Sequence, residues 1–235
     1  MIADWLSFWD KPHSIYVNAR HKDVHYRLIA QEIAQEIVAL VPSRQARVLD
    51  YGSGESLHAG IVAAAAGELL LCDGAPSVRA GIAARFAGIA KIRALAPEDV
   101  ERLPSHSLDF IVLHSVAQYL TPEQTRTLFA LFHRLLQPGG ALLVSDVIPP
   151  QVAASTDVGA LLRFAAANGF LLAALAGLAR TLFSDYWRLR VRFGLTHYSE
   201  AVMMEKLAAA GFTAHRAEKN IGHNQARMAF LARPR

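Results

Sequence analysis

Short apolar runs alternate with stretches of helical character between residues 46 and 147, and this alternation narrows the folds open to the chain more than any other feature. The runs are ARVLDYG, ELLLCDG, AKIRALA, LDFIVLHS and GALLVSDV. Strand and helix alternation of this kind predicts a parallel sheet with helices on both faces. Residues 110–113 (FIVL) are apolar throughout, as expected of a strand that helices cover on both sides. The predicted fold class is therefore α/β.

Two of the predicted helices are marked by spacing and by end signals. Apolar side chains recur every four residues from Ile29 to Val41, which predicts a helix with one buried face. Before the last apolar run, Thr121 and Gln124 have the spacing of a helix-capping box. We expect the PGG at residues 138–140 to stop the helix that begins there.

The pattern divides the chain into three parts. Residues 1–23 carry many aromatic and basic side chains without a clear period, and we expect an irregular N-terminal arm that acts as a lid. Residues 24–150 and 196–235 carry the strand and helix pattern and form the predicted core. Residues 151–195 interrupt that pattern after two prolines, which indicates an inserted helical cap over the substrate.

The apolar stretch at residues 164–179 bears on whether the chain meets a membrane. It has 16 residues, whereas a bilayer span needs ~20, and Asn168 interrupts it, so a buried or lid helix is the better interpretation. The N-terminus lacks the basic region and apolar core of a signal peptide. The single cysteine, Cys72, excludes an internal disulfide framework and a cysteine-rich zinc site. A cytoplasmic location is therefore expected.

The charged residues give no sign of a nucleic-acid or metal site. The net charge is +4 and the arginines are scattered rather than gathered in one basic patch. No cluster of metal-ligating residues is visible in the sequence. We therefore expect neither a nucleic-acid partner nor a metal ion.

The stretch VLDYGSGES, residues 48–56, ends an apolar run on Asp50 and places Gly52 and Gly54 directly after it. In an open parallel sheet, ligands lie beyond the carboxyl ends of the strands, where glycines let a ligand approach the main chain. A plain strand–helix turn explains two glycines equally well. The third glycine of the pyrophosphate-binding GxGxxG pattern is missing, and Glu55 would repel phosphates. A nucleoside ligand without phosphates is therefore expected.

The next apolar run also ends on a carboxylate, Asp73. A Rossmann-like site places an acidic side chain about 20 residues after the glycine loop, where it binds ribose hydroxyls. Asp73 and Gly74 also have the composition of an ordinary turn, which is the alternative interpretation.

Together, these stretches resemble the class I S-adenosylmethionine-dependent methyltransferases. The motifs that carry the resemblance are VLDYGSGES, LLLCDG, SLDFIVLHSVAQYL, LLQPGGALLVSDV and LTHYSEAVMMEKLAAAGF, in this order. They cover roughly residues 25–150 and 195–235. The resemblance implies a Rossmann-like, mostly parallel sheet of seven strands with the last strand antiparallel. It also implies S-adenosyl-L-methionine as cofactor and S-adenosyl-L-homocysteine as product.

The resemblance also assigns cofactor contacts. The residues are Asp50, Gly52 and Gly54 for the amino-acid part, Asp73 for the ribose, and Gly74 and Ala75 for the adenine. The acidic residue that often follows the third strand in this family is displaced here, so the adenine amine is assigned either to Glu98 or to the backbone at Ala96. Tyr16, in the arm, is expected to lie over the cofactor.

Methyl transfer to a hydroxyl needs a base, and a histidine with a pKa near neutrality suits that role. By the resemblance, His114 ends the fourth strand and points toward the reacting methyl, in contact with the cofactor. His21 and His197 are further candidates. The alternatives are that His114 caps the strand or bonds a carbonyl, and that a carbon or amine nucleophile needs no base.

Substrate contacts are expected mainly from the segments that match the family poorly. The candidates are Arg20, Tyr119, Phe164 and Phe170. The apolar character of the two phenylalanines indicates a small hydrophobic or amphipathic substrate, although they would serve equally well in a core or a dimer interface. In extended form, the alternating sequence RLRVR at residues 188–192 would place three arginines on one face, toward solvent, an anionic substrate group or membrane headgroups.

Two other functions stay open at this point. One is an NAD(P)-dependent oxidoreductase on a similar sheet, against which the incomplete GxGxxG counts. The other is a non-catalytic membrane-surface or partner-binding protein with a methyltransferase-like fold, suggested by the apolar stretch and the arginines. Peripheral membrane contact and a homodimer are the partner alternatives beside a small-molecule substrate.

Overall fold

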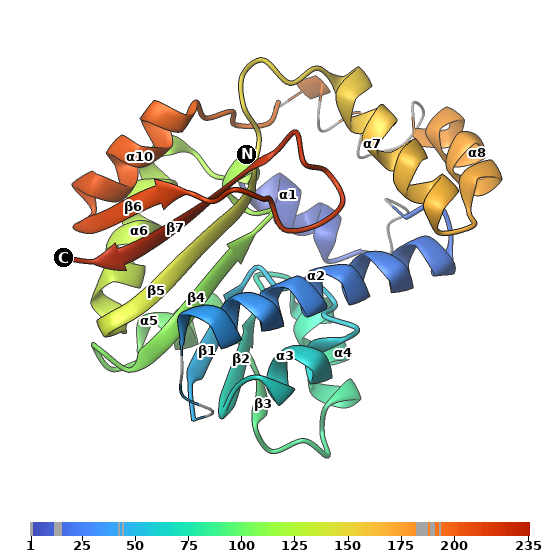
Figure 1. The fold of residues 1–235 in the computed structure, drawn as a ribbon. Helices are drawn as coiled ribbons and strands as arrows, with labels where there is room; N and C mark the ends of the chain where they lie inside the picture. Colours follow the sequence, from blue (N-terminus) through green and yellow to red (C-terminus); the bar gives the residue numbers. More distant parts are fainter. Residues whose placement is uncertain are drawn as a thin grey trace.

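One seven-stranded sheet forms the centre of the molecule (Figure 1). The computed structural model describes residues 2–11, 16–41, 43, 45–181, 188, 191–192 and 194–235. The strands are β1 (Arg47–Tyr51), β2 (Glu68–Cys72), β3 (Ile92–Leu95), β4 (Leu108–His114), β5 (Leu136–Val147), β6 (Phe212–Arg216) and β7 (Met228–Pro234). Their order is β3-β2-β1-β4-β5-β7-β6, with β1 to β5 parallel and β7 antiparallel to both of its neighbours. The predicted α/β class and the antiparallel last strand are confirmed.

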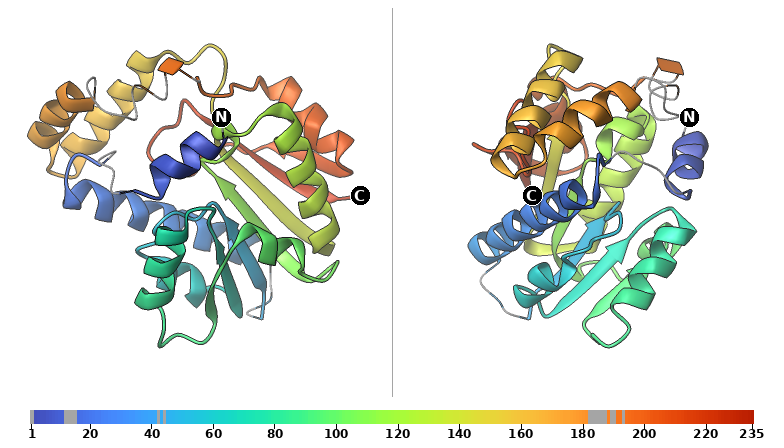
Figure 2. Two further views of the ribbon diagram at one scale, coloured as in Figure 1. Left: turned by 180° about the vertical axis from the view of Figure 1, so that it is seen from behind. Right: turned by 90° about the vertical axis from the view of Figure 1, so that its right-hand side faces the viewer.

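Helices cover both faces of this sheet (Figures 1 and 2). The helices of the described residues are α1 (Ile2–Trp9), α2 (Ala19–Leu40), α3 (Ala59–Ala64), α4 (Pro76–Arg85), α5 (Pro97–Glu101), α6 (Pro122–Leu135), α7 (Ala154–Ala167), α8 (Leu171–Thr181) and α10 (Glu200–Ala209), with a 3-10 turn, η1, at Ala117–Tyr119. Buried residues of α2, α3 and α4 pack on one face, among them Ile33 and Ile82. Buried residues of α5, α6 and α10 pack on the other, among them Phe129 and Leu207.

Strand β4 is buried on both faces, which explains why its sequence is apolar at residues 110–113. Phe110 and Val112 belong to the core on the α2 side. Ile111 and Leu113 point the other way, into the core on the α6 side. Successive side chains of a strand alternate between its faces, so a strand covered on both sides needs apolar residues at every position.

The N-terminal arm is more regular than the sequence predicted. Residues 2–9 form α1, and α2 already begins at Ala19, so the boundary expected at residue 23 lies inside this helix. Asn18 caps α2 by accepting a hydrogen bond from the backbone N–H of His21 over 2.8 Å. The apolar repeat begins only at Ile29, which is why the periodicity missed the first turns of the helix.

The PGG segment lies within a strand, so the prediction that it stops a helix was wrong. Helix α6 ends at Leu135 and β5 begins at the next residue, so residues 138–140 belong to β5. The β4–β5 register shifts between Leu108 and Phe110, opposite this segment. Proline and glycine are tolerated at such irregular strand positions. The predicted capping box at the start of α6 is confirmed.

Helices α7 and α8 form a hairpin beside the first turn of α2 (Figure 2). A small separate core holds it there, in which Phe170 and Ala174 pack with Val17. The Arg20 Nε donates a hydrogen bond to the Asn168 carbonyl at the turn of the hairpin. The hairpin is therefore attached to the N-terminal arm as well as to the core.

The extended form considered for the RLRVR segment, residues 188–192, differs from the backbone that the structure describes there. Residues 188 and 191–192 have helical backbone, while residues 189–190 lie outside the described part. Among the helices of the described ranges, none is both long and apolar enough to cross a bilayer.

Candidate functional site

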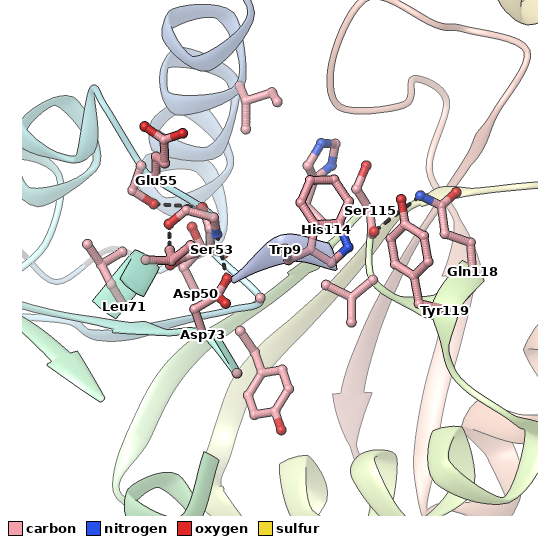
Figure 3. A pocket seen from close by; sticks show the side chains of 18 of the residues that line it. Trp9, Asp50, Ser53, Glu55, Leu71, Asp73, His114, Ser115, Gln118 and Tyr119 are labelled. Carbon is pink, nitrogen blue, oxygen red and sulfur yellow. Dashed lines mark hydrogen bonds between the residues drawn. The ribbon is translucent and has the colours of Figure 1, made fainter. Parts of the chain in front are cut away.

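A cavity of about 810 Å³ opens at the carboxyl ends of β1, β2 and β4 (Figure 3). The sheet order places β1 between β2 and β4, so the strand order reverses at this point. Open α/β sheets bind their ligands at such reversals. The volume falls within the range of roughly 300–1,000 Å³ typical of small-molecule sites.

The backbone N–H groups of the glycine loop, residues 52–55, all donate hydrogen bonds within the protein. The first two donate to the carbonyl of Cys72, over 2.7 and 3.0 Å. The third donates to Asp73 Oδ2 over 3.0 Å, and the fourth to the hydroxyl of Tyr26 over 3.1 Å. A pyrophosphate site needs N–H groups that point at the ligand. This loop has none to spare, because all four are already bonded.

The two carboxylates at the strand ends lie close together in a buried setting. Burial raises the pKa of Asp73, although the backbone N–H groups of Gly54 and Ala75 bond its two oxygens and counteract the shift. Burial raises the pKa of Asp50 to about 7, and repulsion from Asp73 adds to that shift. Two neighbouring carboxylates with raised pKa values would gain from a bound cation, which stabilises their charged forms.

The ionisable lining of the cavity is acidic. Six of its residues carry carboxylates, namely Asp50, Glu55, Asp73, Glu98, Glu101 and Glu123. Among the described residues that line it, none is a lysine or an arginine. Glu55 pairs with Lys22, outside the lining, so part of the acidic charge is compensated from behind. The chain is basic as a whole, with a net charge of +4, so this acidic interior is a local property of the site.

Helix α1 covers one end of the cavity with aromatic side chains. Trp5 is buried, and its ring centroid lies 4.7 Å from that of Tyr119 in η1. Trp9 meets Tyr119 edge-on at 5.9 Å. Just after the helix, Asp10 accepts a hydrogen bond of 2.7 Å from the backbone N–H of Ser77 in α4. The helix is thereby attached to the core beside the strand ends and shields them from water.

Four histidines line the other end of the cavity: His21, His25, His114 and His223. The Nδ1 of His114 lies 2.9 Å from the Ser145 hydroxyl, so the histidine bonds a side chain and not a carbonyl. The ring of His25 lies 6.0 Å from that of His21 and 5.8 Å from that of His223. Burial lowers the pKa of all four, that of His21 to about 4. The cluster is therefore neutral at physiological pH.

The structure brings most of the sequence-predicted residues to this cavity. Those that line it are Asp50, Gly52, Gly54, Asp73, Gly74, Glu98, His114, His21, Tyr16 and Tyr119. They come from β1, β4, α2, α5, η1 and three connecting segments, which meet at one edge of the sheet. Among the described residues, no group of three or more histidines, cysteines or acidic residues is arranged to hold a metal ion.

Three other predicted residues lie elsewhere. Ala75 is buried beneath the lining, where its N–H bonds Asp73. The backbone N–H of Ala96 donates to Asp99 Oδ2 within the capping box of α5. Its carbonyl, the atom that would accept from an adenine amine, accepts from the N–H groups of Asp99 and Val100 at the start of that helix. His197 is exposed before α10 and does not line the cavity. The structure therefore does not bring His197 to the cavity, unlike the other two candidate bases.

Three predicted substrate residues lie behind the cavity wall. Arg20 is exposed and holds the α7–α8 turn. Phe170 stacks on His21, with ring centroids 4.9 Å apart, and Phe164 stacks on His223 at 4.5 Å. The phenylalanines therefore support two histidines of the cavity and are not among the residues that line it, and their role as direct substrate contacts stays a prediction.

Sequence reasoning missed several residues of the site. Trp5 and Trp9 were included only in an irregular arm, and their position over the strand ends depends on how α1 docks. His25 belongs to the segment predicted as core and no motif marks it, although it lies four residues after His21 and so on the same face of α2. His223 lies in the connection between β6 and β7, where no motif marks it.

The model of the family described as "Methyltransferase domain" matches residues 49–144. Solved structures with a similar fold include magnesium protoporphyrin IX methyltransferase from Synechocystis PCC 6803 with bound SAH, at 14% identity and a TM-score of 0.60, over 99% of this chain and 94% of that one. The YcgJ protein from Bacillus subtilis is 14% identical, with a TM-score of 0.59, over 86% of this chain and 97% of that one. At these identities the similarity shows the fold. A comparison with curated proteins gives no match.

A further solved structure with a similar fold belongs to a longer chain. It is N,N-8-amino-8-demethyl-D-riboflavin dimethyltransferase from Streptomyces davawensis, 18% identical, with a TM-score of 0.58. The match covers 100% of this chain and 62% of that one, which is longer. This similarity too concerns the fold.

Proposed function

From the premise that this chain carries a methyltransferase domain of the class I S-adenosylmethionine-dependent type, we propose that it transfers a methyl group from S-adenosyl-L-methionine to a small hydrophobic or amphipathic molecule. The cofactor would lie across the ends of β1 and β2, and the acceptor would lie between it and the histidines. The chain would release S-adenosyl-L-homocysteine.

The observation that carries this proposal is the charge of the cavity. S-adenosyl-L-methionine has a sulfonium and an ammonium against one carboxylate and no phosphate, so it is a cation. A lining with six carboxylates and, in its described part, no lysine or arginine suits such a ligand. This acidic lining would repel the pyrophosphate of NAD(P). The glycine loop, residues 52–55, also has no unbonded N–H groups for that pyrophosphate. The oxidoreductase alternative is therefore disfavoured.

The residues of the chain would hold the ribose and the reacting groups in place. Each oxygen of Asp73 accepts one backbone hydrogen bond and keeps a further lone pair, so the carboxylate can also accept from ribose hydroxyls. The cofactor supplies a methyl group on a sulfonium that leaves readily. Alignment of the reacting groups can contribute many kcal/mol to catalysis, and the aromatic cover of α1 would keep water away from them.

His114 is the residue best placed to take a proton from an acceptor hydroxyl. It ends β4 at the cavity, and the Ser145 contact occupies its Nδ1, which leaves Nε2 for a ligand. Because burial lowers its pKa, the imidazole is unprotonated at neutral pH and can accept a proton. An amine or carbon nucleophile would not need this step.

Calorimetric titration with S-adenosyl-L-homocysteine and with NAD tests the cofactor assignment directly. We expect binding of S-adenosyl-L-homocysteine and no heat with NAD; the reverse result would favour an oxidoreductase. Transfer of label from methyl-labelled S-adenosyl-L-methionine to a panel of phenols, amines and carboxylic acids would then identify the acceptor class. Cofactor binding without transfer to any acceptor would favour the non-catalytic alternative.

The exposed face of α8 favours a second property, peripheral membrane contact. Leu171, Leu172 and Leu175 are exposed on this helix, Leu172 by 83% of its surface. Apolar side chains of this kind can enter the interface of a bilayer. Flotation of the protein with phosphatidylcholine vesicles tests this proposal, with Leu172→Asp as the variant expected to abolish it. If the wild type stays in the unbound fraction, the face serves another purpose, such as the homodimer predicted from the sequence.

A further inference from the structure

Two of the cavity histidines have a ring nitrogen with no hydrogen-bond partner among the residues that the structure describes. His25, from α2, and His223, from the connection between β6 and β7, both line the cavity, with ring centroids 5.8 Å apart. The Nδ1 atom of each is buried and has no hydrogen-bond partner in the described structure. A buried polar atom without a partner costs about 1–3 kcal/mol. Because both rings line the same cavity, a ligand held between them would complete their bonding.

The rings are held in position by packing on several sides. Phe164 of α7 stacks on His223 with centroids 4.5 Å apart and an interplanar angle of 16°. Tyr16 contacts His25 at 5.5 Å. His114 is close to this pair, since a side chain at Gly222 would lie 3.9 Å from its Cε1. The pair is therefore fixed beside the end of β4, next to the place proposed for the reacting methyl.

The chemistry of the pair limits what it can bind. A neutral imidazole has one nitrogen that donates and one that accepts, according to its tautomer. Burial lowers the pKa of both histidines, so neither brings a positive charge for a carboxylate or phosphate. A hydroxyl group can donate to one imidazole nitrogen and accept from another. The aromatic side chains around the pair suit a flat apolar ring that carries such a hydroxyl.

We propose that His25 and His223 form the acceptor subsite and bind the hydroxyl group of a flat, uncharged ring compound through their Nδ1 atoms. This proposal rests on the proposed function, since it concerns the acceptor of the same methyl transfer. It predicts that phenol-like compounds bind at this end of the cavity while the cofactor product occupies the other.

Calorimetry with 2-naphthol, on protein saturated with S-adenosyl-L-homocysteine, provides the test. The variants are His25→Phe and His223→Phe, which keep a ring for the packing contacts, and His215→Phe as a control, because His215 is exposed on β6. We expect each cavity variant to weaken 2-naphthol binding about tenfold, which corresponds to ~1.4 kcal/mol. The control should bind as the wild type does. 2-Methoxynaphthalene, which cannot donate, should bind weakly and equally to all four proteins.

A second pair of variants distinguishes the loss of a hydrogen bond from a folding defect. The side-chain amide of His25→Asn or His223→Asn lies near the position of Nδ1 and should restore most of the 2-naphthol affinity. The proposal is wrong if 2-naphthol binds the Phe variants as tightly as the wild type, or does not bind the wild type. It is also wrong if 2-naphthoic acid or 2-(aminomethyl)naphthalene binds more tightly than 2-naphthol. Failure of S-adenosyl-L-homocysteine to bind the wild type would instead reject the proposed function itself.

Discussion

The backbone N–H of Gly54 donates a hydrogen bond of 3.0 Å to the Oδ2 atom of Asp73. This bond joins the loop after β1 to the carboxylate after β2, so the two sequence motifs that pointed to a nucleoside site are parts of one structure. Asp73 therefore has two tasks: it orients the loop and, in the proposed function, it binds the ribose.

Two replacements of Asp73 should distinguish its role in orienting the loop from its role in binding the ribose. Asp73→Asn keeps an acceptor for one backbone N–H, and we expect it to weaken S-adenosyl-L-homocysteine binding about tenfold, because a charge-assisted bond becomes a neutral one. Asp73→Ala removes every acceptor and should weaken binding about 100-fold. Calorimetry measures both, with Glu205→Gln as control, since Glu205 is exposed on α10. Unchanged affinity in Asp73→Ala would show that the ribose lies elsewhere.

A side chain at Gly52 should disturb the loop, whereas one at Gly60 should not. Gly52 has a φ of +78°, and a Cβ there would lie 2.2 Å from Val116 Cγ2. Gly60 lies in α3 with nothing within 4 Å of an added Cβ. We expect Gly52→Ala to lower the free energy of unfolding by about 2 kcal/mol. Gly60→Ala should leave it unchanged or raise it by up to about 1 kcal/mol.

Urea denaturation gives both unfolding free energies, and calorimetry gives the matching affinities for S-adenosyl-L-homocysteine. The affinity should fall in Gly52→Ala alone. Equal stability and equal affinity in the two variants would mean that the loop tolerates a different backbone geometry.

Because the side chain of His21 is buried in its neutral form, the free energy of unfolding should fall in mild acid. This side chain is only 5% exposed, and burial lowers its pKa to about 4 from an ordinary value of 6.5. Between these two values the unfolded chain binds a proton that the folded protein does not, so its contribution to stability is complete above pH 6.5 and declines as the pH falls toward 4. The expected loss between pH 7.5 and pH 5 is about 2 kcal/mol from this residue.

His21→Phe should reduce that acid sensitivity, since phenylalanine can keep the stack on Phe170. It should cost about 1 kcal/mol at pH 7.5, because the backbone N–H of Val17 loses its bond to Nδ1. Urea denaturation at both pH values measures the two effects. His215→Phe, at an exposed position, should retain the wild-type slope, and the same slope in His21→Phe would contradict the assignment.

The ion pair between Asp157 and Arg227 should hold α7 over the acceptor end of the cavity. Arg227 is 9% exposed, and its Nη2 lies 2.8 Å from Asp157 Oδ2, with a second bond of 3.2 Å from Nε to Oδ1. We expect Asp157→Asn to cost about 2 kcal/mol, because a buried guanidinium loses much of its charge partner. Glu200→Gln breaks an exposed pair with Arg216 and should cost at most about 1 kcal/mol.

Hydrogen exchange should reveal where the Asp157→Asn defect lies. Amides of residues 154–181 should exchange faster, while those of β1 and β4 keep their protection. Since α7 carries Phe164, 2-naphthol binding should weaken while S-adenosyl-L-homocysteine binding stays within about twofold. Uniformly faster exchange would mean that the pair supports the whole fold and not the cap.

The core of the fold could be predicted because its signals are local. An apolar run such as residues 110–113 buries both of its faces, and the capping box at Thr121 fixes a helix start within four residues. The glycine loop and Asp73 could be predicted as site residues for a similar reason. In a parallel sheet the carboxyl ends of neighbouring strands meet at one edge, so two motifs at strand ends must lie near each other.

The cover of the site was decided by tertiary contacts between segments far apart in the sequence. Trp5 reaches Tyr119 only because α1 docks across the sheet edge, and His25 meets His223 although the two are 198 positions apart in the sequence. Neither pairing has a sequence period or a spacing that predicts it. The sequence by itself determined the sheet and the meeting of the glycine loop with Asp73 at the strand ends, because these depend on local patterns. Only the tertiary structure decided which aromatic and imidazole rings line the cavity there, because that choice depends on how separate helices pack.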